Sequence, residues 1–196
     1  MKIFREVAIT VLIAVAVFAL LRLTVQSYTV KMSSMEPNFY QDYCIMVSKV
    51  SYHSSGPQRG DVIVFNPPPA AGDTSGIPFI KRVIGLPGEI VEITDEEVFV
   101  NGMALDEPYI MASPDYTMPA TEIPESEYFV LGDNRNNSND SHTGWLVPRG
   151  NIVGKALFIY WPPGKLGIVK HYSYPELSEV DEQETMVAHS LGVALE

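Results

Sequence analysis

Glu97-Val98-Phe99-Val100-Asn101-Gly102-Met103-Ala104-Leu105 is the clearest hairpin signal in this chain. Its Asn101-Gly102 pair supplies the two adjacent residues with positive φ that a type I′ turn requires. Short runs of β-branched and aromatic residues, bounded by Gly, Pro, Asn or Asp, recur before and after this stretch. The pattern predicts a mainly β fold.

The expected strands follow from these runs and from the punctuation between them. They are Cys44–Lys49, Asp61–Asn66, Phe79–Ile84, Ile90–Thr94, Glu97–Val100, Tyr128–Leu131 and Gly154–Trp161. They place one β-rich unit over residues 28–170 of the 196-residue chain, with loops at 67–78 and 106–127. Residues 175–196 are expected to form an acidic, flexible tail. Fifteen prolines argue against a helical bundle, and 46% apolar residues argue against disorder.

Charge and cysteine content argue against several classes of protein. The formal net charge is −11, and no basic patch is large enough to follow a phosphate backbone, so we expect no nucleic-acid partner. The single cysteine, Cys44, rules out an intramolecular disulfide framework and a multi-cysteine metal site. Its apolar surroundings predict a buried, inert strand residue. The four histidines are scattered, and we expect no metal site.

The N-terminus carries an apolar run from Val7 to Val25, close to the roughly 20 residues that a helix needs to cross a bilayer. Arg22 lies near its end, where the long stem can reach the headgroups. A cleavable signal peptide is the competing interpretation, but no small-x-small cleavage pattern follows closely. We expect an uncleaved anchor over residues 7–25. Lys2 and Arg5 then predict that residues 1–6 stay in the cytoplasm and the rest is translocated.

Three segments offer chemistry. Ser34 lies in the turn-prone stretch Lys31–Pro37, Lys81 lies in the apolar stretch Phe79–Glu89, and Gly132–Ser141 is a dense polar loop. A buried lysine is costly unless it is neutral or paired, and a neutral amine beside a serine hydroxyl is a general base beside a nucleophile. Alternatively, Lys81 points to solvent from an edge strand while Ile80 and Val83 point inward. The residues alone leave both interpretations open.

These segments resemble, in order, three motifs of the type I signal peptidases. They are Ser34-Met35-Glu36-Pro37, then Lys81-Arg82-Val83-Ile84-Gly85-Leu86-Pro87-Gly88, then Gly132-Asp133-Asn134-Arg135-Asn136-Asn137-Ser138-Asn139-Asp140-Ser141. The resemblance covers residues 28–163 and the anchor. It implies an antiparallel β-sheet domain with one N-terminal transmembrane helix. It also implies a membrane-bound serine endopeptidase that removes signal peptides from exported preproteins, without a metal or cofactor.

The resemblance also implies roles for individual residues. Ser34 matches the nucleophile, Lys81 the general base, and Ser138 the serine that orients the lysine amine. Supporting polar residues are matched by Arg82, Asp133, Arg135 and Asp140. Pocket linings are matched by Tyr28, Val30, Met32, Met35, Phe39, Phe79 and Ile80, and their bulk implies shallow pockets for small residues at −1 and −3. The substrate would bind as an added β-strand.

The chain departs from the family pattern at three positions. Met32 stands where many members have serine or glycine, Asn136 where aspartate is common, and His142 where arginine is common. The Ser34 amide would supply one oxyanion donor, and the second would have to come from Ser33, another amide or water.

Two other functions stay open at this stage. One is a self-cleaving serine–lysine repressor of the LexA type, which would need a DNA-binding module where this chain has an apolar span. The other is a catalytically dead, membrane-anchored binding module. For the peptidase, the implied partners are preproteins and a lipid bilayer, in a bacterial plasma membrane or a thylakoid membrane. We also expect burial to lower the pKa of Lys81, and Arg82 and Arg135 to lower it further by like-charge repulsion.

Overall fold

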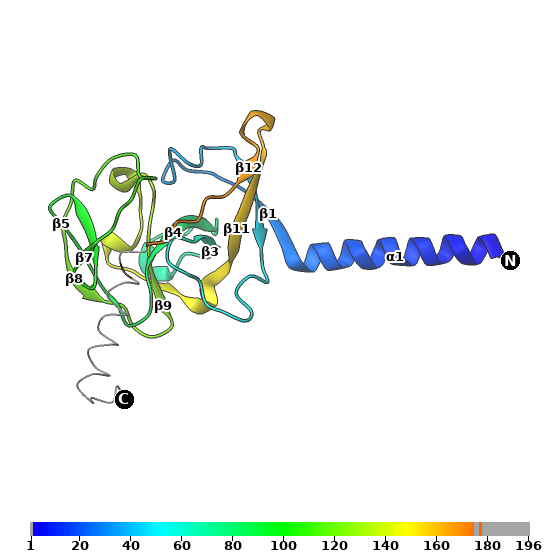
Figure 1. The fold of residues 1–196 in the computed structure, drawn as a ribbon, viewed down its shortest axis with the longest axis horizontal. Helices are drawn as coiled ribbons and strands as arrows, with labels where there is room; N and C mark the ends of the chain where they lie inside the picture. The colour runs from blue at the N-terminus through cyan, green and yellow to red at the C-terminus, as the bar shows by residue number, and fades with distance from the viewer. Residues whose placement is uncertain (1, 175–176, 178–196) are drawn as a thin grey trace.

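The computed structural model describes residues 2–174 and residue 177. The expected tail, 175–196, therefore lies outside the described residues except for Leu177. Helix α1 spans Lys2–Thr24 and is mostly apolar, and none of its residues is buried. Within the described part of the chain it is the one helix long and apolar enough to cross a membrane. It projects away from the β-rich body (Figure 1).

The β-rich body is built from short strands. Their bounds are β1 Val25–Thr29, β2 Cys44–Ser48, β3 Val62–Phe65, β4 Phe79–Gly85, β5 Ile90–Thr94, β6 Glu97–Val100, β7 Met103–Ala104, β8 Met118–Glu122, β9 Glu127–Leu131, β10 Val147–Pro148, β11 Ile152–Trp161 and β12 Gly167–Ile168. Single 3-10 turns lie at Pro69–Ala71, Arg135–Asn137, Ser141–Thr143, Arg149–Asn151 and Pro163–Lys165. The fold is therefore mainly β, with one apolar helix ahead of it.

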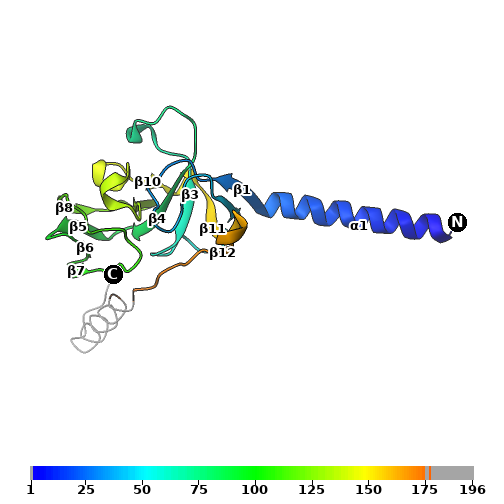
Figure 2. The same cartoon turned by 90° about the horizontal axis from the view of Figure 1, so that it is seen from above.

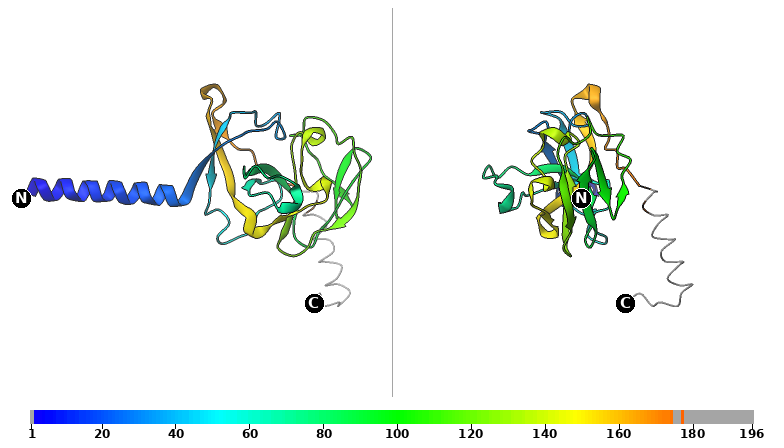
Figure 3. Two further views of the ribbon diagram at one scale, coloured as in Figure 1. Left: turned by 180° about the vertical axis from the view of Figure 1, so that it is seen from behind. Right: turned by 90° about the vertical axis from the view of Figure 1, so that its left-hand side faces the viewer.

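The strands form two antiparallel sheets. The larger has the order β1-β2-β11-β3-β4-β9-β10, with β12 added against β11, and the smaller has the order β7-β6-β5-β8. The smaller sheet lies at the end of the body far from α1 (Figures 1 and 3). The loop between β3 and β4, which carries Pro69–Ala71, extends away from the body (Figure 2).

The hairpin predicted at Asn101-Gly102 is confirmed. Asn101 and Gly102 have φ values of 51° and 80°, and Val100 pairs with Met103 across the turn. The preceding turn is built in the same way, because Asp95 and Glu96 both have positive φ between β5 and β6. These turns place consecutive strands side by side and create the smaller sheet.

Hydrophobic side chains pack on both faces of the larger sheet. One cluster contains Val30, Met35, Val47 and Val62, and a second contains Ile63, Phe65, Phe79 and Trp145. A third cluster joins the smaller sheet to the ends of β4 and β9. Because β3 and β4 are covered on both faces, side chains near the middle of β4 are buried whichever way they point.

Each of the seven predicted strands is present, and three corrections are needed. Strand β8 lies in the segment that was expected to be a loop, and it pairs with β5 as an outer strand of the smaller sheet. Val25, expected in the anchor, is the first residue of β1, which pairs with β2. Cys44 lies in a strand as predicted but is only partly buried, because it sits at the strand's first position.

Candidate active site

Ser34 lies in a tight turn between β1 and β2. The Glu36 amide donates to the Ser33 carbonyl at 3.1 Å, and the amides of Asn38 and Phe39 donate to the Met35 carbonyl. The Met35 side chain is fully buried in the core beneath this turn. The buried methionine and the backbone bonds together hold the neighbouring Ser34, which is itself buried, at one position against the sheet.

Lys81 lies in the middle of β4, paired with Ile63 of β3. Its side chain does not point to solvent: the residue is 1% exposed, whereas Ile80 is partly exposed. The Nζ atom donates a hydrogen bond to the Ser34 Oγ at 2.5 Å. The structure therefore excludes the solvent-facing interpretation, and a buried amine contacts a buried hydroxyl 47 residues away in the sequence.

Burial lowers the pKa of Lys81 from its usual value of 10.5 to about 8. The neighbouring charges act in the opposite direction, since Asp140 and then Asp133 raise this pKa. The prediction that Arg82 and Arg135 lower the pKa of Lys81 further is wrong, because both guanidinium groups are paired with carboxylates. At pH 7 about one Lys81 amine in ten is neutral, against about one in 3,000 for an unperturbed lysine.

The polar loop after β9 packs against the Ser34 turn. The Asn134 amide donates to the Ser34 carbonyl at 3.0 Å, and the Asn134 side chain donates to the Ser33 carbonyl at 3.2 Å. Gly132 lies so close that a Cβ atom there would overlap with the Ser34 carbonyl oxygen and the Ser138 hydroxyl. The turn and the loop therefore fit together only because position 132 has no side chain.

Ser138 is near Ser34 and Lys81, which we call the dyad, but it does not make the contact expected of it. Its Oγ is buried and has no hydrogen-bond partner among the described residues, so it does not orient Lys81 in this structure. It lines the same cavity as Ser34 and Lys81. A buried hydroxyl without a partner carries a free-energy cost, and this one borders the place where a substrate would enter.

Asp140 accepts hydrogen bonds that stabilise the polar loop after β9. It is fully buried, and its Oδ2 accepts from the Gly132 amide at 2.8 Å. Its Oδ1 accepts from the His142 ring at 2.6 Å, and that ring stacks on Tyr116 at 4.1 Å between centroids. His142, which departs from the family pattern, thus takes part in the loop's packing.

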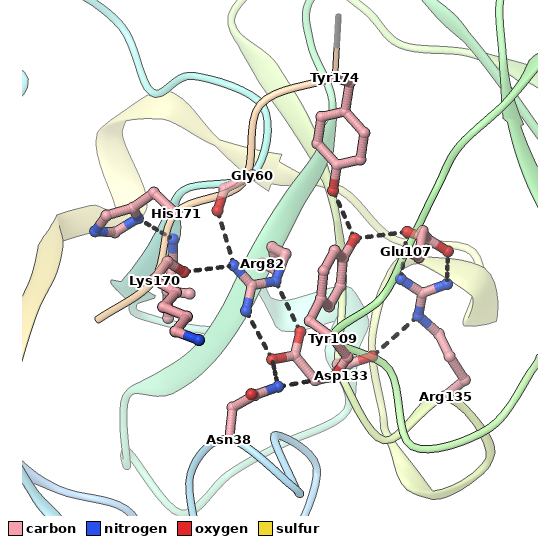
Figure 4. A network of polar contacts seen from close by, with 12 residues as sticks. Asn38, Gly60, Arg82, Glu107, Tyr109, Asp133, Arg135, Lys170, His171 and Tyr174 are labelled. Carbon is pink, nitrogen blue, oxygen red and sulfur yellow. Dashed lines mark hydrogen bonds and ion pairs between the residues drawn. The ribbon is translucent and has the colours of Figure 1, made fainter. Parts of the chain in front are cut away.

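Arg82 and Arg135 each form a bidentate pair with a carboxylate (Figure 4). Arg82 donates to Asp133 from Nε at 2.9 Å and from Nη2 at 2.8 Å. Arg135 donates to both Glu107 oxygens, and its Nε donates to the Gly132 carbonyl at 3.1 Å. Asn38 donates to Asp133 at 2.8 Å. These contacts connect β4, the Ser34 turn and the polar loop.

A small, mostly apolar cavity of about 50 Å³ opens beside Ser34 and Lys81. Five of the residues expected to line a substrate pocket border it, namely Tyr28, Val30, Met32, Phe79 and Ile80. Met35 and Phe39 do not line this cavity; they are buried in the core under the Ser34 turn. Ile45, Val64, Ile77 and Pro78 also border the cavity and were not anticipated.

A larger, more polar cavity of about 900 Å³ also borders Ser34 and Lys81. It is lined by Met32, Ser33 and residues of the polar loop. Met32 is about half exposed and has no hydrogen-bond donor to offer in its side chain. The Ser33 hydroxyl accepts from the Asn137 side chain at 3.0 Å, which leaves its own proton available to the cavity.

No group of three or more His, Cys, Asp or Glu side chains with metal-binding spacing occurs in the described residues.

Four residues that form hydrogen bonds around the site were not predicted from the sequence: Glu107, Tyr109, Asn38 and Asn137. The one available signal was Arg135 itself, because a buried guanidinium requires a carboxylate partner. Nothing near Glu107 in the sequence identifies it as that partner, since 28 residues separate the two. The partner is found only when the fold is known.

The known proteins that this chain resembles are peptidases, in agreement with the buried Ser34–Lys81 contact. The family profile described as "Signal peptidase, peptidase S26" matches residues 3–161. The chain is 45% identical over 144 residues to a probable signal peptidase I-1 of Synechocystis, covering 72% of this chain and 74% of that protein. It is 38% identical over 140 residues to thylakoidal processing peptidase 1 of Arabidopsis thaliana, covering 68% of this chain and 41% of that protein.

A crystal structure of a signal peptidase I from Enterococcus faecalis matches with 33% identity and a TM-score of 0.43, covering 52% of this chain and 97% of that one. The sequence matches define the class first: this is a serine peptidase with an apolar helix ahead of a β-rich domain. The chain belongs to the signal peptidase I family, peptidase S26, whose activity is the removal of signal peptides.

Proposed function

We propose that Ser34 is the nucleophile and Lys81 the general base of this peptidase. The hydrogen bond between the Lys81 Nζ and the Ser34 Oγ carries the proposal, because it joins two buried groups and positions the amine to accept the hydroxyl proton. Burial supports the assignment, since it lowers the pKa of Lys81 to about 8. A base with a pKa near the working pH transfers protons most effectively.

The reaction sequence follows from this pair. Neutral Lys81 takes the Ser34 proton while the Ser34 Oγ attacks the scissile carbonyl carbon. The resulting ammonium then protonates the leaving amine, and the acyl-enzyme ester remains on Ser34. Lys81, neutral again, takes a proton from water, which attacks the ester and releases the new acid. Ser138, which borders the cavity, is proposed to meet the Lys81 amine during this cycle.

Two further parts of the site act on the substrate. The Ser34 amide makes no hydrogen bond within the described residues, so it is available to the oxyanion of the tetrahedral intermediate. The small cavity accepts a side chain about the size of alanine. Segments 28–32 and 77–81 lie on its border, and their backbone groups can pair with an extended substrate. Arg82, Asp133, Arg135 and Asp140 hold these parts in place.

The apolar helix α1 is consistent with a single-pass membrane anchor, and relatives occur in bacteria and in the thylakoid. We propose that residues 1–6 lie in the cytoplasm, that residues 7–24 are the anchor, and that the catalytic domain, 28–170, lies on the translocated side. Lys2 and Arg5 favour this orientation. Added protease should then digest the domain in sealed right-side-out vesicles, and its complete protection would contradict the orientation.

Cleavage of a purified preprotein by the wild type, Ser34→Ala and Lys81→Met tests the dyad. Both variants should lose activity by at least about a thousandfold, as removal of a nucleophile or its base does elsewhere. Lys49→Met, which changes a partly buried lysine that directly follows β2 and borders neither cavity, is the matched control and should retain wild-type rates. Equal rates in all four proteins would disprove the assignment.

A further inference from the structure

The segment Val169–Tyr174, which we call the strap, follows β12 and forms hydrogen bonds with residues of β11, β3 and β4. It lies beyond the part of the chain that the family profile matches, which ends at residue 161. Val169 is buried in the core of the larger sheet, and Tyr174 is buried in the cluster that joins the smaller sheet. Figure 4 shows Lys170, His171 and Tyr174 of the strap around Arg82.

The strap holds Arg82 from two sides. The Lys170 carbonyl accepts from the Arg82 Nη1 at 3.1 Å, and the same nitrogen donates to the Gly60 carbonyl at 2.9 Å. The Tyr172 ring centroid lies 5.1 Å from the guanidinium carbon, and the Tyr109 ring centroid lies 4.2 Å from it. Aromatic faces so placed attract the buried cation, so the strap restricts where Arg82 can lie.

Arg82 is connected to Ser34 through Asp133 and its neighbours. Its partner Asp133 also accepts from Asn38, which belongs to the Ser34 turn, at 2.8 Å. The next residue, Asn134, donates its amide to the Ser34 carbonyl. Since Lys81 and Arg82 are adjacent in β4 and point to opposite faces, a shift of Arg82 and Asp133 would move the Ser34 turn relative to the Lys81 amine.

Tyr174 gives the strap a second connection. Its hydroxyl contacts the Tyr109 hydroxyl at 2.6 Å, and Tyr109 donates to Glu107 at 2.6 Å. Glu107 pairs with Arg135, which donates to the Gly132 carbonyl behind the Ser34 turn. Both connections end at the polar loop, and both start from residues that the family motifs do not contain.

We propose that the strap is a positioning element for the Ser34–Lys81 dyad and that Tyr172 is its principal positioning residue. This inference rests on the proposed function of the dyad. The small substrate cavity lies around Lys81 and is not lined by the strap, so loosening the strap should affect catalysis rather than substrate binding. Displacement of a reacting group by about 1 Å can lower a rate about a hundredfold.

The test measures kcat and KM for preprotein cleavage by the full chain in detergent, well below each protein's unfolding temperature. Tyr172→Ala should lower kcat by at least about tenfold with KM within about twofold of wild type. Tyr172→Phe should restore kcat, because it keeps the ring and the Tyr172 hydroxyl makes no hydrogen bond within the described residues. Tyr174→Phe keeps the packing and removes one hydroxyl contact, and it should also lower kcat. This variant tests the inference even if Tyr172→Ala fails to fold.

Tyr160→Ala is the matched control, since Tyr160 is a partly buried tyrosine whose hydroxyl contacts Ser27, away from Arg82. An equal loss of kcat in Tyr160→Ala, or wild-type kcat in both Tyr172→Ala and Tyr174→Phe, would overturn the inference. A Lys81→Met variant run in parallel separates the two proposals. If it keeps its activity, the dyad assignment fails; if it is inactive while the strap variants are fully active, only the strap inference fails.

Discussion

Gly132 and Ser34 are in such close contact that a Cβ atom on Gly132 would overlap with the Ser34 carbonyl oxygen. Because this carbonyl also accepts from the Asn134 amide, the loop and the turn share a single arrangement. Gly132→Ala should push the two apart and lower kcat about a hundredfold. Gly164→Ala, where an added Cβ would meet nothing, is the control and should keep full activity. Full activity in Gly132→Ala would mean that the turn adapts freely.

The pKa of Lys81 sets the pH dependence of the reaction. If the neutral Lys81 amine is the base, as proposed, its pKa of about 8 means that kcat/KM should rise about tenfold per pH unit below 8 and level off above it. An unperturbed lysine would place the rise near 10.5. The measurement is a pH–rate profile from about pH 5 to 9.5 with a substrate that lacks titrating groups near the scissile bond. A flat profile would show that another group is the base.

Stability should respond to the same shift with a definite sign. Between pH 8 and 10.5 the unfolded Lys81 binds a proton that the folded one has lost, so folding stability rises with pH across this window. The full penalty, about 3 kcal/mol, applies below pH 8 and disappears above 10.5. Urea unfolding of the wild type and Lys81→Met should therefore show the wild type gaining relative to the variant between pH 8 and 10.5. A constant difference would contradict the lowered pKa.

Substitution of Ser138 should affect activity and stability in different directions. Its buried hydroxyl has no partner in the described residues, so Ser138→Ala removes a buried polar group without breaking a hydrogen bond. We expect unchanged or higher thermal stability, by up to about 1 kcal/mol, together with lower kcat if the hydroxyl meets Lys81 during the reaction. Thermal unfolding and cleavage assays on one preparation measure both. A clear loss of stability would indicate a hydrogen bond that the structure does not contain.

The size of the cavity predicts substrate choice. A preprotein with leucine at −1 must overpack a space of about 50 Å³, and overpacking costs about 1–3 kcal/mol. Cleavage should therefore be roughly tenfold to a hundredfold slower than with alanine at −1. Val30→Ala, which removes two methyl groups from the lining, should narrow this ratio. Equal rates for the two substrates with the wild type would refute the pocket assignment.

Local patterning predicted most of the sheet. Strands β5 and β6 were placed to the residue, because alternating apolar side chains and turn residues lie next to each other in the sequence. Strand β8 was missed because Pro119 lies within it, and proline is tolerated there only because β8 is an outer strand. Whether a strand is outer or inner depends on the other strands, which local patterning does not report.

The site was predictable where it depends on residue type and not where it depends on packing. Ser34 and Lys81 came from a resemblance between motifs, whereas the burial of Lys81 depends on layers that cover both faces of β4. Without them the amine could as well have faced water. The pairing of Arg82 with Asp133 and of Arg135 with Glu107 also came only from the fold. Nearby charge acts on the pKa of Lys81 in the direction opposite to the expected one, because Asp140 and then Asp133 raise it.

Helix α1 passes directly into β1, since Thr24 is the last helical residue and Val25 the first of the strand. The Thr24 carbonyl accepts from the Lys49 amide at 2.8 Å, which fastens the end of the helix to the sheet. Ser34 follows Val25 by nine positions, so it lies at most about 30 Å along the chain from that junction. With α1 in the membrane, as proposed above, Ser34 stays within this distance of the bilayer surface. Cleavage would then depend on how far a peptide bond lies from the membrane as well as on the side chains that flank it.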